Sequence, residues 1–188
     1  MSDGTVGYHK ERPSRLHRFI RLLASTCDPR AWIHLVRMVN YYNYSHVRPM
    51  RSIRLAGPGN ISPDAVFQNA ERIEIGHRVR IGSRCFLWAG PGSARIVIGD
   101  DVLFGPEVML TAATYRHEDG DPITDQAMRE SDIVIGDGVW LATRAIVLPG
   151  TTIGAGAIIA SGAVVKGDVP PRAIMAGSPA MIVGYRRS

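Results

Sequence analysis

The chain has 188 residues, 45% of them apolar, which is enough for one folded domain with a sizeable core and argues against wholesale disorder. Only two cysteines are present, too few for a disulfide scaffold, so both are expected to be reduced structural thiols. No apolar run approaches the roughly 20 residues of a membrane span, and arginines interrupt the apolar stretches near the N-terminus, so neither a span nor a signal peptide is expected. The cytoplasm is the default compartment.

The positive charge is concentrated near the N-terminus. Residues 1–54 contain 10 lysines and arginines against 3 acidic residues, whereas residues 55–188 contain 12 against 14. A basic segment can bind nucleic acid, but no recognition motif or aromatic stacking platform accompanies this one, so nucleic acid is not an expected partner. We therefore expect two parts, a basic segment at 1–54 and a separate domain at 55–188.

The basic segment is predicted to be helical over residues 12–26 and 29–42. In the first helix four apolar residues share one face (Leu16, Phe19, Ile20 and Leu23). Asp28 is a suitable N-cap for the second helix, with proline at the first helical position. Two interpretations remain open: residues 1–50 form an interfacial helix pair that contacts an anionic membrane, or they form a cap that packs on the adjoining domain or on a neighbouring subunit.

A six-residue repeat begins after the basic segment. Steps of six from Ile75, Ile98 and Ile135 meet only large apolar residues: Ile75, Ile81, Leu87, Ile98, Phe104, Leu110, Ile135, Leu141, Val147, Ile153, Ile159 and Val165. The positions two residues before these are also apolar or small: Ile73, Val79, Cys85, Ile96, Val102, Val108, Ile133, Val139, Ala145, Thr151, Ala157 and Ala163. Positions two apart in an extended chain point to the same side, so each hexad is predicted to be a short strand with two inward side chains.

The residue after the large apolar position is often glycine, as at Gly76, Gly99 and Gly136, which we interpret as freedom of φ at a corner. Strand and corner repeating every six residues predict a coil with three sides, in which stacked coils pair their strands in parallel around a dry core. The fold class is therefore all-β, a parallel β-helix of hexapeptide repeats with an N-terminal α-helical segment.

The repeat is interrupted twice. Ile75 and Ile98 lie 23 residues apart, five more than one coil, and Ile98 and Ile135 lie 37 apart, 19 more than one coil. We therefore expect a short loop near residues 91–93 and one long loop at about 112–132, inserted between coils. Long ordered loops are often functional.

The hexads "IGHRVRIG", "IGDDVLFG" and "IGDGVWLA", followed by "LPGTTIGAGAIIASGAVVKGDVPPRAIMAGSPA", resemble the hexapeptide-repeat acyltransferases. The resemblance covers roughly residues 55–185 and is strongest to sugar O-acetyltransferases of the maltose/galactoside acetyltransferase and polysaccharide-biosynthesis types. It implies a left-handed β-helix, a homotrimer with sites between subunits, acetyl-CoA as acyl donor and a sugar hydroxyl as acceptor.

The long loop is where the resemblance places the catalytic histidine, and His117 is the only histidine in it. Imidazole is suited to remove the hydroxyl proton near neutral pH, so His117 is the expected general base. Tyr115 occupies the position at which single-histidine relatives have theirs. We expect Tyr115, Asp119 and Asp121 to contact the acceptor.

The resemblance places the donor beside the last coils. Trp140 would lie near the thioester, and Lys166 would meet phosphate. The residues expected to contact the pantetheine arm are small or expose their backbone (Ala142, Thr143, Ala160, Ser161 and Gly162). This chain departs from the family pattern at Ala142, where the family has glycine, and at Gly167, which places Lys166 one position early.

A metal site is not expected, because no pair of histidines has ligand spacing and His77 and His117 are the only histidines in the repeat region. Three functions stay open from sequence alone: acetyl transfer to a sugar hydroxyl, transfer of another acyl group or to an amine, and a non-catalytic β-helix scaffold.

Overall fold

The computed structural model describes residues 13–118 and 120–187, and the chain divides into two compact units, Met1–Tyr41 and Tyr42–Ser188. The first unit contains helix α1 (Arg15–Thr26) and nearly all of α2 (Pro29–Tyr42). The second unit contains every strand of the described chain.

The two helices form where the sequence predicts them. Ser14 caps α1 by accepting a hydrogen bond of 3.2 Å from the backbone N–H of His17, and the predicted start at Arg12 lies outside the described residues. Asp28 accepts a 2.9 Å hydrogen bond from the N–H of Arg30, which confirms it as the cap of α2. Neither helix has a buried residue. In the described part of the chain, no helix has the length and apolarity needed to cross a membrane.

Two short turns begin the second unit, a π-helical turn η1 (Asn43–Val47) and a 3-10 turn η2 (Pro49–Arg51). The imidazole Nδ1 of His46 lies 2.8 Å from the carbonyl oxygen of Ala65, and the ring tilts against Phe67 with centroids 5.9 Å apart. Ile53 follows and joins the core at 7% exposure. Residues 43–53 therefore pack against the first coil.

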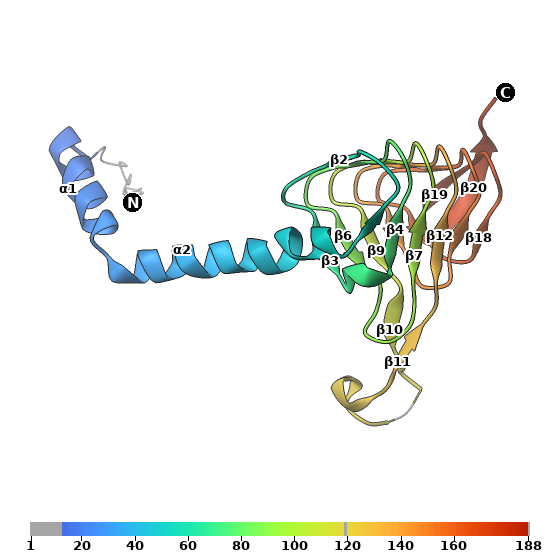
Figure 1. The fold of residues 1–188 in the computed structure, drawn as a ribbon, viewed down its shortest axis with the longest axis horizontal. Helices are drawn as coiled ribbons and strands as arrows, with labels where there is room; N and C mark the ends of the chain where they lie inside the picture. Colours follow the sequence, from blue (N-terminus) through green and yellow to red (C-terminus); the bar gives the residue numbers. More distant parts are fainter. Residues whose placement is uncertain (1–12, 119, 188) are drawn as a thin grey trace, which may run out of the picture. The chain divides into compact units, whose positions relative to one another are not determined.

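The coils form a three-sided prism (Figure 1). The first face consists of β1 (Arg54–Leu55), β4 (Ile73–Ile75), β7 (Ile96–Ile98), β12 (Ile133–Ile135), β15 (Thr152–Ile153) and β18 (Asp168–Val169). The second face consists of β2 (Asn60–Ile61), β5 (Arg80–Ile81), β8 (Leu103–Phe104), β13 (Trp140–Leu141), β16 (Ile158–Ile159), β19 (Ala173–Gly177) and β20 (Ala180–Tyr185). The third face consists of β3 (Val66–Gln68), β6 (Phe86–Trp88), β9 (Met109–Thr111), β14 (Ile146–Val147) and β17 (Val164–Val165).

Strands within each face pair in parallel, except that β20 turns back antiparallel on β19 and ends the stack. The predicted long loop leaves between β9 and β12, as an antiparallel hairpin of β10 (Ala113–Tyr115) and β11 (Met128–Glu130). The predicted short loop lies between β6 and β7. A 3-10 turn, η3 (Ala70–Arg72), precedes β4, and another, η4 (Ile123–Asp125), lies in the hairpin loop.

The core confirms the predicted period of six. All 24 positions identified from the repeat are at most 3% exposed. Identical inward positions stack from coil to coil, so that Ile73 pairs with Ile96, which pairs with Ile133. Thr151 is the polar member of the set, and its hydroxyl donates to the carbonyl of Leu148 at 2.7 Å.

The interpretation of the corner glycines was wrong. Gly76 does not have a positive φ; a Cβ there would lie 2.6 Å from the backbone carbon of Gly99 on the next coil. Glycine is needed at these corners because successive coils approach too closely for a side chain. The left-handed backbone occurs instead about two residues later, for example at Arg78 with φ 55° and Asp101 with φ 58°.

Candidate functional site

The hairpin β10–β11 holds the predicted catalytic loop away from the stack of coils (Figure 1). Tyr115 pairs with Met128 at its last rung, and the N–H of Arg116 donates to the carbonyl of Ala127 at 3.0 Å. His117 follows two residues beyond β10 and is exposed to solvent. The hairpin therefore presents an imidazole at the start of a loop whose base is fixed.

The loop also exposes acidic side chains and Tyr115. Glu118 forms an ion pair of 2.5 Å with Arg129 on β11, across the mouth of the loop. Asp121 accepts through its backbone carbonyl from the side-chain amide of Gln126 at 2.8 Å, which leaves its carboxylate at the surface. Tyr115 is 43% exposed. Asp119, also predicted to contact the acceptor, lies outside the described residues.

Glu130 anchors the hairpin to the short loop of the preceding coil. Its carboxylate accepts backbone hydrogen bonds from Gly92 at 2.6 Å, Ser93 at 2.7 Å and Ala94 at 3.2 Å. Burial alone would raise the pKa of Glu130, but these three bonds and the charge of Arg72 outweigh it and the pKa is lowered. The carboxylate is therefore charged at neutral pH.

This contact between the two insertions was not predicted from the sequence. Both loops follow a third-face strand, β6 and β9, so both leave the prism at the edge between the third and first faces. We call this the third–first edge. The insertion points, Leu87 and Leu110, stand at equivalent places in successive coils, and that equivalence was the available signal.

Five residues predicted to contact the donor lie together at the edge between the second and third faces. We call them the small-residue strip (Ala142, Thr143, Ala160, Ser161 and Gly162). The N–H of Gly162 donates to the carbonyl of Thr143 at 3.0 Å, and the N–H of Ala142 donates to that of Ile159 at 2.8 Å, so two stacked corners form the strip. Thr143, Ser161 and Gly162 are exposed. The strip offers backbone that a thin ligand can approach.

Trp140 lies next to the strip, on the outer surface of the second face. It pairs with Leu103 on one side and Ile158 on the other, and 45% of it is exposed. Lys166 does not lie there. It follows β17 and so stands at the third–first edge, at the opposite end of that strand from Gly162.

An ionic ladder borders the strip and was also missed from sequence. Glu107 accepts from Arg144 at 2.5 Å and from Arg84, so three successive coils are joined at one edge. The hydrogen bonds from Arg144 and Arg84 lower the pKa of Glu107. Two guanidinium groups share the Glu107 carboxylate, and the carboxylate of Asp64 lies beside Arg84 at the same edge, so two cations are balanced by two anions there.

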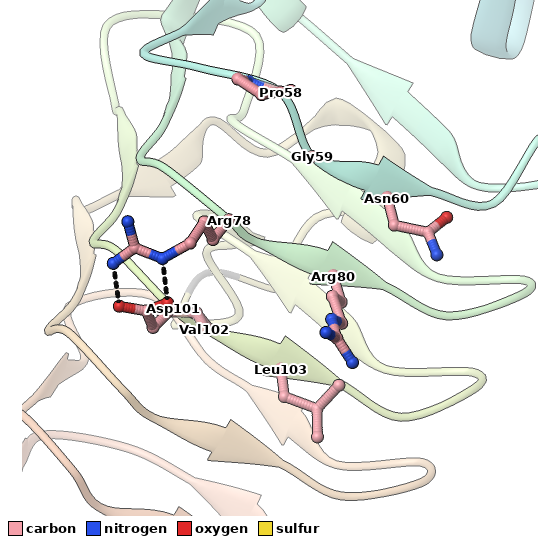
Figure 2. Close-up of a pocket in the computed structure, with 8 residues that line it drawn as sticks. All are labelled: Pro58, Gly59, Asn60, Arg78, Arg80, Asp101, Val102 and Leu103. Carbon is pink, nitrogen blue, oxygen red and sulfur yellow. Dashed lines mark hydrogen bonds and ion pairs between the residues drawn. The ribbon is translucent and has the colours of Figure 1, made fainter.

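The hollow shown in Figure 2 lies on the second face of the first coils. It has a volume of about 540 Å³, and its polar lining includes Asn60, Arg80 and the ion pair of Arg78 with Asp101. The hydrogen bond from Arg78 lowers the pKa of Asp101. None of the residues predicted for the site lines this hollow. On one chain the predicted site consists of the exposed loop and the small-residue strip, in which Thr143, Ser161 and Gly162 are exposed and Ala142 is buried.

Comparisons with known proteins agree with the repeat. Residues 132–167 match the family model described as bacterial transferase hexapeptide (six repeats). A solved hexapeptide-repeat acetyltransferase of Vibrio cholerae, complexed with acetyl-CoA, is 28% identical, covers 74% of this chain and 75% of its own, and superposes with a TM-score of 0.67. In its repeat and in its fold the chain is similar to hexapeptide-repeat acetyltransferases. Their left-handed parallel β-helix is the fold of the second unit.

Two curated proteins are more similar to this chain in sequence than the solved Vibrio cholerae structure is. A Schizosaccharomyces pombe protein whose name proposes it as an acetyltransferase is 38% identical, over 64% of this chain and 56% of its own length. Escherichia coli WbbJ, whose name proposes it as an O-acetyltransferase of lipopolysaccharide biosynthesis, is 34% identical over 47% of this chain and 49% of its own. The chain thus spans about half the length of these relatives.

Among residues 13–118 and 120–187, no three side chains of His, Cys, Asp or Glu lie close enough to hold a metal ion. His77 is exposed at a corner of the prism, where its backbone N–H donates to the carboxylate of Asp100 at 2.6 Å.

Proposed function

We propose that this hexapeptide-repeat protein is an acetyl-CoA-dependent O-acetyltransferase. The observation that carries the proposal is the exposed His117, held on an anchored hairpin in a fold shared with an acetyltransferase that binds acetyl-CoA. Imidazole titrates near neutral pH and is the side chain best suited to this proton transfer.

In the proposed reaction, a ring nitrogen of His117 takes the proton of the acceptor hydroxyl as its oxygen attacks the thioester carbonyl. The carbon–sulfur bond then breaks, and the imidazolium returns the proton to the departing thiolate. The products are the acetyl ester and free coenzyme A, so protons balance and the histidine is regenerated.

The small-residue strip is the proposed donor site. Pantetheine would lie along the exposed backbone between Thr143 and Gly162, with its thioester near Trp140. Lys166 is proposed to meet a phosphate. Because Lys166 and the strip stand at different edges of one chain, both can contact one donor only if the donor is long enough or if two chains meet.

The proposed acceptor is a sugar hydroxyl, free or linked to a nucleotide or lipid, in surface polysaccharide biosynthesis. Tyr115, Asp119 and Asp121 are proposed to contact it, since carboxylates and phenols hydrogen-bond sugar hydroxyls. The relationship to WbbJ supports this acceptor class. Transfer to an amine, or of another acyl group, is the second candidate, because no motif specifies the acceptor pocket.

We further propose a homotrimer in the cytoplasm, with its N-terminal segment at the inner face of the membrane. The second face leaves Leu103 and Trp140 exposed beside each other, an apolar surface that a second copy could cover. His117 of one chain would then face the strip of another. Mass measurement by light scattering should give three chains, and a monomer would contradict this part.

The test of function begins with the donor. Thermal unfolding is measured with acetyl-CoA, with ADP as control; at about 100 times its Kd a ligand should stabilise by roughly 2.7 kcal/mol per site. A larger shift with acetyl-CoA than with ADP supports the donor site. Acetyl transfer is then screened with sugars and nucleotide sugars.

A β-helix used only as a scaffold makes the opposite prediction. It should show no acetyl-CoA shift and no transfer, and that result would overturn the proposed function. Transfer to amines with no transfer to hydroxyls would instead favour the second candidate.

A further inference from the structure

The helices α1 and α2 carry an apolar surface that the first unit does not bury. Leu16 is 68% exposed, Val36 68% and Trp32 57%, and neither helix has a buried residue. Apolar area of this extent in water favours a partner.

The apolar residues of α1 share one face. At 100° per residue, Leu16, Phe19, Ile20 and Leu23 cluster within about a third of the helix circumference. Arg18 and Arg21 project from the opposite side, three residues apart. The helix thus has an apolar face and a cationic face.

Helix α2 has the same two-sided character with a broader apolar face. Arg30, His34 and Arg37 follow at steps of four and three, so they form one polar stripe. The apolar residues occupy the rest of the surface (Trp32, Leu35, Val36, Met38, Val39 and Tyr42). Trp32 also fixes the junction of the helices, since its indole N–H donates to the carbonyl of Thr26 at 2.8 Å.

The charge of the segment is almost entirely positive. Between Pro13 and Ile61 the sole acidic residue in the sequence is Asp28, and that carboxylate caps α2. The two helices alone contain five arginines, and Asp28 is the one carboxylate in residues 13–61 that could pair with them. An anionic surface is the complement to such a segment.

A second copy of the helices is a poorer complement. Helices that associate through a coiled-coil seam have a narrow apolar stripe and often acidic and basic residues flanking it. Here the apolar face of α2 is broad, and its flanking charges are arginines without glutamates. Association of copies would bring like charges together.

We propose that α1 and α2 bind in the plane of an anionic phospholipid surface, with their apolar faces in the acyl boundary and their arginines at the headgroups. Broad apolar faces with aromatic residues, opposite cationic faces, are the features of interfacial helices. Trp32, Tyr41 and Tyr42 are exposed and supply the amphipathic rings that are favoured at the headgroup boundary. This proposal concerns the first unit and does not depend on acetyl transfer.

The test is flotation of the full-length protein with phosphatidylcholine vesicles, with and without phosphatidylglycerol. Binding is expected to the anionic vesicles, to weaken with salt, and to be weak on neutral ones. Each arginine near an anionic surface strengthens binding about fivefold, so Arg18→Gln with Arg21→Gln should weaken it roughly 25-fold. Arg80→Gln with Arg95→Gln removes the same charge from the β-helix and should leave binding unchanged.

A second variant tests the apolar faces. Phe19→Gln, Trp32→Gln and Val36→Gln together should abolish flotation, while circular dichroism and the melting temperature confirm an intact β-helix. Equal flotation on both vesicle types, or equal loss from the β-helix arginine pair, would overturn the proposal. The proposal would also be overturned if the protein did not float and if substitutions in α1 and α2 changed the mass of its oligomer, because a second copy would then be the partner of the helices.

Discussion

The backbone N–H of Gly92 lies 2.6 Å from the carboxylate of Glu130, so the loop of one coil is bound to the hairpin inserted after the next. This bond and those from Ser93 and Ala94 fix the base of the hairpin that presents His117. The position of His117, the proposed general base, thus depends on the Glu130 carboxylate, which three backbone N–H groups hold in place.

Glu130→Gln should lower turnover and stability together, because an amide is a weaker acceptor and offers only one oxygen. We expect an unfolding free energy lower by about 1–3 kcal/mol and a reduced kcat with acetyl-CoA binding retained. Asp132→Asn is the matched control, since Asp132 accepts one N–H from Arg95, at 2.8 Å, outside the hairpin. Equal losses of kcat in both variants would contradict a special role for Glu130.

The stability that the Glu130 carboxylate contributes should decrease as the pH falls. The pKa of Glu130 is lowered from 4.5 by folding, so its stabilisation is fully present above that value and is lost as the pH falls through the folded pKa. The difference in melting temperature between the parent and Glu130→Gln should therefore persist at neutral pH and shrink in acid. A difference that grew on acidification would exclude this origin.

His117→Ala should lower kcat by about 10²–10⁴-fold, the usual contribution of a general base, while acetyl-CoA still raises the melting temperature. His77→Ala removes an exposed histidine of the same chain at a corner of the prism and should leave turnover unchanged. Activity of His117→Ala within about threefold of the parent would reject the role.

Most of the fold could be predicted because each inward side chain belongs to a local pattern. Ile75 and Ile81 differ by one hexad, and the core needs nothing beyond that spacing and apolarity. The hairpin was expected only as a loop, since pairing of Tyr115 with Met128 depends on two strands separated by a long connection. Glu130 was missed because its partners are backbone groups of another coil, which side-chain chemistry does not reveal.

A substitution in the small-residue strip tests the proposed donor site. Ser161→Leu places a branched side chain on exposed backbone and should raise the KM for acetyl-CoA without lowering the melting temperature. Ala155→Leu makes the same kind of change at an exposed position between the first and second faces and should leave the KM unchanged. Equal KM values for the two variants would place the donor elsewhere.

Two different physical reasons require glycine in the coils, close approach of the backbone at Gly105 and a positive φ at Gly138. A Cβ at Gly105 would lie 2.7 Å from the backbone nitrogen of Thr143, so Gly105→Ala must push two coils apart, whereas Gly138 has open space but φ 63°. We expect Gly105→Ala to cost about 1–3 kcal/mol through overpacking. Gly138→Ala should cost roughly 1–2 kcal/mol through backbone strain alone. Gly120→Ala, with space around it, is the control. Urea unfolding measures all three, and an unchanged free energy for Gly105→Ala would refute the close-approach explanation of the corners.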